Sequence, residues 1–87
     1  MERWRFHIIA APDGSPAAIR MYLRVGDDES AWPRLQINVD GTEVPVDDQP
    51  VDYEAPEWKA IQIVKEAGSS EARWEELKEK LRAQVAS

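Results

Sequence analysis

The sequence predicts an α+β fold, a four-stranded antiparallel β-meander (ββββαα) with two C-terminal helices packed on one face in a two-layer sandwich. Three observations predict it. Apolar and polar residues alternate with period two along several stretches of the first half. An Asp40-Gly41 pair divides the last of these stretches, as in a β-hairpin. On both sides of Gly68, apolar residues instead recur with helical spacing.

Composition narrows the class of protein. The 87 residues predict a single domain, residues 1 to 87, with a core of modest size. The absence of cysteine excludes a disulfide scaffold and any zinc site that uses sulfur. A net charge of -6 argues against a protein whose whole surface attracts nucleic acid. No apolar run is long enough for a signal peptide or a membrane span, so we expect a cytoplasmic protein with no membrane partner.

Two alternating stretches, residues 3 to 10 and residues 18 to 25, predict the first two strands. In the first stretch Phe6 and Ile8 fall on one face, whereas Arg5 and His7 fall on the other. A loop rich in turn-forming residues joins the two strands, and an acidic loop that ends near Trp32 follows the second. These strands therefore predict a second hairpin with a looser turn.

The third and fourth strands, residues 34 to 39 and residues 42 to 46, are predicted from the Asp40-Gly41 pair. A type I′ turn at these two residues would place Ile37 opposite Val44. Because Pro45 has no amide hydrogen to donate to a neighbouring strand, the fourth strand is expected at the edge of the sheet.

Two helices are predicted after an irregular connection, residues 48 to 56. The first, residues 57 to 67, has opposed apolar and charged arcs, and Gly68 is a natural stop. The second, residues 70 to 85, carries Trp74, Leu77 and Leu81 in a narrow apolar stripe, and Ser69 or Ser70 can cap its first turn. Both helices are expected to cover the apolar face of the sheet and to leave the other face in water.

The face expected in water is a candidate anion-binding surface. The predicted register also sets Arg34 opposite Asp47 on this face. A basic platform with one aromatic residue can contact phosphates or stack a base. The alternative is a plain solvated face whose arginine side chains shield the strands. The candidate residues are Arg3, Arg5, Arg20, Tyr22, Arg24 and Arg34.

Trp58 marks a second candidate surface, because its helical angle falls in the charged arc of the first predicted helix. Either it packs against the preceding connection or Trp32, or it stands exposed as an anchor for a partner. Acidic residues nearby would steer a basic partner toward it. The candidate partner-binding residues are Trp58, Tyr53, Asp52, Glu54 and Trp32.

The sequence offers little for catalysis. His7 is the single histidine, and we find no glycine-rich phosphate loop, no nucleophile motif, no metal site and no need for a cofactor. We therefore expect a small acidic, non-enzymatic protein-binding module of the inhibitor, immunity, antitoxin or adaptor type, as a monomer or homodimer. The alternatives are nucleic-acid or anion binding through the arginine-rich face, and a designed domain with no ligand.

Overall fold

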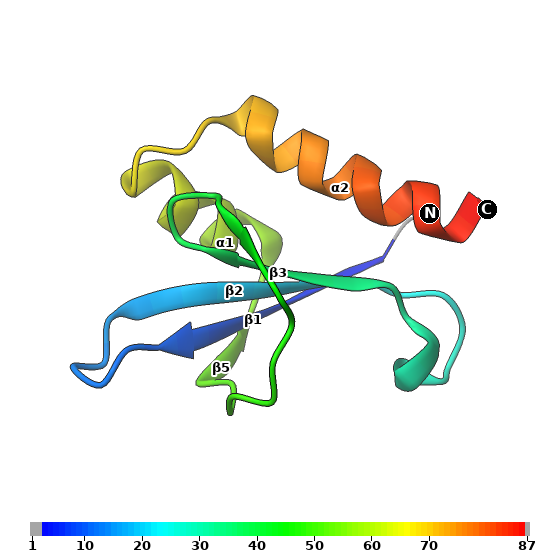
Figure 1. The fold of residues 1–87 in the computed structure, drawn as a ribbon, viewed down its shortest axis with the longest axis horizontal. Helices are drawn as coiled ribbons and strands as arrows, with labels where there is room; N and C mark the ends of the chain where they lie inside the picture. Colours follow the sequence, from blue (N-terminus) through cyan, green and yellow to red (C-terminus); the bar gives the residue numbers. More distant parts are fainter. Residues whose placement is uncertain (1–2, 87) are drawn as a thin grey trace.

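A computed structural model describes residues 3–86, in which the chain forms an antiparallel sheet flanked by two helices (Figure 1). The α+β class predicted from the sequence is therefore confirmed. The elements in chain order are β1 (Trp4–Ala10), β2 (Pro16–Leu23), the 3-10 helix η1 (Glu29–Ala31), β3 (Arg34–Asn38), β4 (Glu43–Val44), β5 (Tyr53–Ala55), α1 (Glu57–Glu66) and α2 (Glu71–Ala86).

The described sheet has five strands, one more than predicted, in the order β4-β3-β2-β1-β5. The extra strand, β5, lies within the segment that the sequence predicts as an irregular connection. It pairs with β1, with Tyr53 opposite Ile8 and Ala55 opposite Phe6. As expected, β4 lies at one edge, and β5 forms the other. Strand β2 starts and ends two residues earlier than predicted, and Val25 lies outside it.

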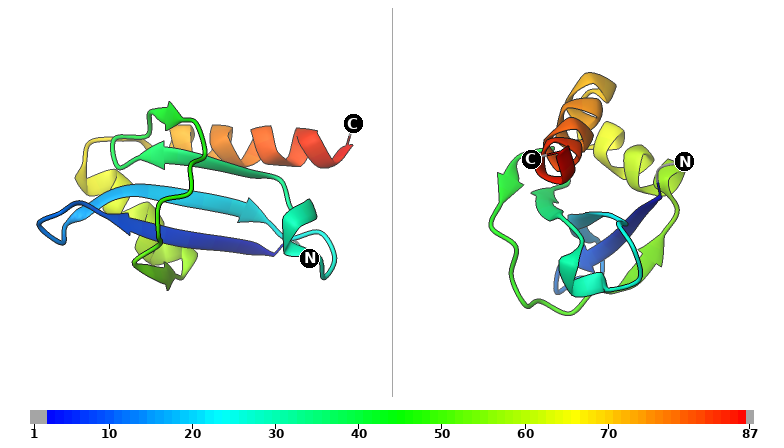
Figure 2. Two further views of the ribbon diagram at one scale, coloured as in Figure 1. Left: turned by 60° about the horizontal axis from the view of Figure 1, so that its bottom comes forward. Right: turned by 90° about the vertical axis from the view of Figure 1, so that its right-hand side faces the viewer.

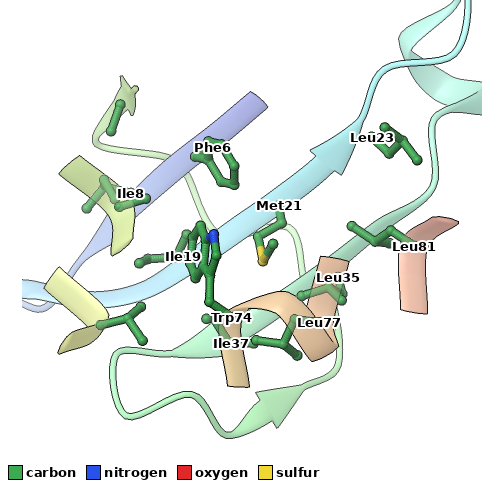
Figure 3. Packing of buried hydrophobic residues seen from close by; sticks show 13 residues of the cluster. Phe6, Ile8, Ile19, Met21, Leu23, Leu35, Ile37, Trp74, Leu77 and Leu81 are labelled. Carbon is green, nitrogen blue, oxygen red and sulfur yellow. The ribbon is translucent and has the colours of Figure 1, made fainter. Parts of the chain in front are cut away.

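Both helices lie on the same face of the sheet, as predicted (Figure 2). Side chains from the strands and from the helices interdigitate there into one apolar core (Figure 3). Trp74 of α2 is fully buried, and its ring stacks on Phe6 with 5.3 Å between centroids. Helix α2 is capped by Ser70, whose Oγ accepts a hydrogen bond from Arg73 N (3.1 Å). No helix in residues 3–86 is long and apolar enough to cross a membrane.

The predicted type I′ turn at Asp40-Gly41 is wrong. Only Gly41 of the pair has a positive φ, at 87°. Its N–H donates to Asn38 O (2.9 Å), and Asn38 N–H donates to Thr42 O (2.8 Å), so the turn begins at Asn38 and ends on the glycine. The start of α2 and the residues before it lie against this turn, since a Cβ at position 41 would lie 2.5 Å from Ser69 Oγ and 3.3 Å from Arg73 Cγ. Glycine is therefore needed here for its backbone conformation and for the close approach.

This turn shifts the register of β4 by one residue from the prediction. Ile37 lies opposite Glu43, and Gln36 lies opposite Val44. The shift moves each β4 side chain to the other face of the sheet. Glu43 therefore points to the helix side, where it forms an ion pair with Lys80 of α2. Val44 joins the opposite face.

That opposite face is not in water, so the expectation that the helices leave it open to solvent is wrong. Residues 45–52, here called the strap, leave β4, cross the face opposite the helices and reach β5 (Figure 2, green). The backbone of Asp52 anchors its far end by donating to Ile8 O (2.6 Å). Arg20, Tyr22 and Gln36 are all buried on this face. The sheet is therefore covered on one side by helices and on the other by loops.

Candidate binding sites

Most of the predicted anion-binding residues converge at one end of the sheet face that the strap covers, here called the strap-side face, where they surround two buried rings. Trp32, from the β2–β3 connection, is 4% exposed, and its indole N–H donates to Gly26 O (3.1 Å). The guanidinium groups of Arg5 and Arg24 lie over its ring at 5.0 and 5.3 Å from the centroid. Cation–π attraction of this kind favours arginine over aromatic faces. We call these arginines, Arg34 and the rings that they cover the arginine cluster. Trp32 belongs to this cluster and not to the exposed surface around Trp58.

Tyr22 forms the neighbouring half of this cluster. It is 3% exposed and lies 6.4 Å from Trp32 between ring centroids. Arg34 covers it, with the guanidinium carbon 5.1 Å from the ring centroid. The same guanidinium donates to Glu29 O (2.6 Å) and Trp32 O (3.3 Å). Arginine side chains therefore lie over both the Trp32 ring and the Tyr22 ring. A nucleic-acid base could stack on these rings only after displacing those side chains.

The arginine cluster is only partly neutralised. Arg5 pairs with Glu29 (3.5 Å) and Glu54 (3.4 Å). Arg24 and Arg34 have no carboxylate partner among residues 3–86. The same holds for the exposed Arg3, the residue before β1. Three guanidinium groups at this end thus keep charge available for an anion.

Arg20 sits at the centre of the strap-side face and ties the strap to the sheet. It is 8% exposed. Its Nε and Nη2 both donate to Gln36 Oε1 (3.1 and 3.0 Å). Nη2 also donates to Asp47 O (2.8 Å) and Asp47 Oδ1 (3.3 Å). The sequence register assigned Asp47 to Arg34, and the one-residue shift of β4 explains why the strap brings it to Arg20 instead.

His7 lies between Arg20 on β2 and Glu54 on β5. Its ring packs edge-on against Tyr22 with 5.0 Å between centroids. Its Nδ1 is the only fully enclosed side-chain nitrogen or oxygen without a hydrogen-bond partner among the described residues. Burial lowers the pKa of His7 below its ordinary value of 6.5; Arg5 and Arg20 lower it further, whereas Glu54 and Glu29 oppose the shift. The ring therefore favours its neutral form.

A cleft of about 450 Å³ opens between the strap and the sheet. Its polar lining includes Gln36 of β3, together with Asn38, Asp47 and Gln49. Its apolar lining comes from β1, β2 and the β4 end of the strap, namely Ile9, Ala17, Ala18, Val44 and Pro45. No local pattern in the sequence could indicate this cleft, because it is bounded by a strap whose path depends on distant contacts.

Most of the predicted partner-binding residues lie together, at β5 and the start of α1. Trp58, in the first turn of α1, is 66% exposed, so the alternative that it packs inside the molecule is wrong. Tyr53 is 41% exposed on β5. Asp52 and Glu54 flank Tyr53 and are also exposed. Of the predicted set only Trp32 is displaced, because it is buried in the arginine cluster.

Metal binding has no support in the geometry: residues 3–86 contain no cluster of three or more histidine, aspartate or glutamate side chains placed to hold an ion. Comparison with known proteins adds no assignment, because no protein-family model, no curated protein and no solved structure matches the chain.

Proposed function

We propose that the protein is a non-enzymatic binding module that takes up a basic, extended segment of another protein along β5, with Trp58 as the central contact. The observation that carries this proposal is the 66% exposure of Trp58, three residues after the edge strand β5. Exposure of so large an aromatic side chain is costly in water, and tryptophan is enriched where interfaces derive their affinity. An inhibitor, immunity, antitoxin or adaptor protein would work in this way.

The outer edge of β5 supports an extended ligand. This strand pairs with β1 on one side and is the last strand of the described sheet on the other. A partner strand can add to such an edge through backbone hydrogen bonds, while side-chain contacts supply specificity. Tyr53 pairs with Ile8 and so projects to the helix side of the sheet, the side on which α1 and Trp58 lie. An added strand would therefore meet both aromatic residues.

Charge favours a basic ligand. The chain carries a net charge of -6. Asp52 has no cationic partner among residues 3–86, and Glu54 shares Arg5 with Glu29. A second copy paired antiparallel about Glu54 would place two like charges side by side, which is unfavourable. A segment with lysine or arginine opposite Glu54 avoids this repulsion.

The test is a selection from a displayed library of random peptides of about ten residues, with excess Trp58→Ala protein present as competitor. We expect lysine- and arginine-rich peptides that bind about tenfold or more weakly to Trp58→Ala by calorimetry. Val85→Ala, which removes an exposed apolar side chain from the far end of α2, is the matched control and should bind normally. Because Trp58 is exposed, its loss should leave the melting temperature nearly unchanged.

Two outcomes would contradict the proposal. One is a selection that yields no peptide able to distinguish Trp58→Ala from the wild type. The other is heparin binding that disappears when Arg24 and Arg34 are both changed to glutamine, with no peptide bound at β5. That second result would favour the anion-binding alternative, for which the unneutralised guanidinium groups are the supporting observation.

A further inference from the structure

The cleft beneath the strap is lined by a buried side-chain amide whose oxygen is hydrogen-bonded and whose nitrogen is not. Gln36 is 2% exposed. Its Oε1 accepts two hydrogen bonds from Arg20, and only an oxygen can accept from a guanidinium, so the orientation of the amide is fixed. Its Nε2, which carries two N–H donors, has no acceptor among residues 3–86. A buried donor is thus left without a partner.

This free donor faces the cleft and not a closed void. Gln36 lines the cleft. Within the described residues, His7 Nδ1 is the sole unpartnered side-chain atom that is fully enclosed, so Gln36 Nε2 keeps some access to solvent. An acceptor that enters the cleft can therefore reach it. Buried amides in native proteins are normally satisfied at both ends, by protein or by another molecule.

Asp47, the charged residue in the lining, is already neutralised. Asp47 Oδ1 accepts from Arg20 (3.3 Å) and from Gln49 N (3.1 Å), and Asp47 Oδ2 accepts from Gln49 Nε2 (2.9 Å). Arg20 in turn has this carboxylate as its counter-ion. The cleft therefore offers neither an unpaired carboxylate for a cation nor an unpaired arginine for an anion. The rest of its wall is largely apolar.

We propose that the cleft is a binding site for a small, neutral, largely apolar molecule that carries a carbonyl acceptor, with Gln36 Nε2 as the donor to that carbonyl. A volume of about 450 Å³ lies within the range of small-molecule sites. A largely apolar lining with a small number of oriented polar groups is the usual composition of such sites. This site is separate from the β5 surface and does not depend on the function proposed for it.

N-methylpyrrolidone is a suitable probe, because it is small and neutral and has a carbonyl but no N–H. Titration of the ¹⁵N-labelled protein should give saturable shifts of the Gln36 side-chain amide, with a dissociation constant of about a millimolar. The side chain of Gln62 on α1, which donates to Glu66 (3.2 Å), serves as an internal control and should not move. N-methylpyrrolidine, which lacks the carbonyl and is cationic at neutral pH, should not bind.

Gln36→Glu is the decisive variant. It keeps an oxygen for Arg20 and replaces the free donor by an acceptor, so N-methylpyrrolidone should bind about tenfold or more weakly. Ala17→Leu, which narrows the cleft without touching the amide, should weaken binding as well and keeps the test informative if Gln36→Glu does not fold. The proposal is overturned if the probe shifts no cleft residue, if the amine binds equally well, or if every variant that folds binds the probe like the wild type.

Discussion

The two faces of the sheet are both buried, but by different means. The helix-side face is covered by regular, amphipathic α1 and α2, and its central contacts are apolar, as in the stacking of Phe6 on Trp74, whereas ion pairs such as that of Glu43 with Lys80 lie around them. The strap-side face is covered by loops, and its contacts are hydrogen bonds and cation–π pairs around Arg20 and Trp32. Helices bring a continuous apolar stripe to a sheet, whereas short loops bring few apolar side chains. A loop-covered face must therefore be held by polar groups that satisfy one another.

The contrast between the two faces predicts its largest difference in stability for substitutions of the two buried tryptophans. Trp74→Ala should lower the free energy of unfolding by about 3 to 5 kcal/mol, because it leaves a cavity between a helix and the sheet that cannot close. Trp32→Ala should cost less, about 1 to 3 kcal/mol, because the loop and the arginines around it can collapse into the space. Denaturant unfolding of both variants measures the difference, and equal losses would show that the loop-covered face is packed as rigidly as the core.

A smaller effect is expected where the strap is tied down. Arg20→Met removes the bonds to Gln36 and Asp47 and should cost about 1 to 3 kcal/mol, because the buried Oε1 of Gln36 loses its donor. Arg3→Met, at an exposed position, is the matched control and should change stability by less than about 0.5 kcal/mol. Hydrogen exchange gives a second readout, since the amide of Gln49 should exchange faster only in Arg20→Met. Unchanged exchange there would mean that the strap is held by other contacts.

The same contrast explains which parts of the fold could be predicted from the sequence. Alternation in β1, β2 and β3 identified the apolar face correctly, and helical spacing identified α1 and α2, because each pattern is local. Strand β5 was missed, since its three residues are too few to show a period and form a strand only by pairing with β1. The register of β4 was missed because a glycine in a positive-φ conformation fits more than one type of hairpin turn.

The candidate sites divide in the same way. Trp58 stood out because it contradicts the amphipathic pattern of its own helix, which is a local signal, and its exposure follows from that position. The burial of Tyr22 and Trp32 and the pairing of Arg20 with Asp47 all depend on loops that fold back over the sheet. Such contacts join residues far apart in the chain and leave no periodic trace. The cleft at Gln36 could therefore be recognised only from the structure.

The smallest expected effect concerns His7. Its imidazole ring can titrate on the strap-side face, whereas the helix-side core contains no histidine. Burial lowers its pKa in the folded protein, and Tyr22, Arg5 and Arg20 surround it, with Glu54 as the main opposing charge. Below about pH 6.5 the unfolded chain then binds more protons at this residue than the folded protein does. The contribution of His7 to stability is thus fully present above that pH and is lost as the pH falls toward the folded-state pKa.

His7→Phe tests this contribution, because it keeps a ring against Tyr22 and removes the titration. The wild type should lose more stability than the variant between about pH 8 and about pH 5, while the carboxylates titrate alike in both proteins. The free energy of unfolding, measured in denaturant at each pH, gives the difference directly. If the two proteins follow the same pH profile, the His7 ring stays hydrated in the folded state and the strap does not seal this part of the sheet. The strap-side face would then be a covered but wet layer, unlike the dry core beneath the helices.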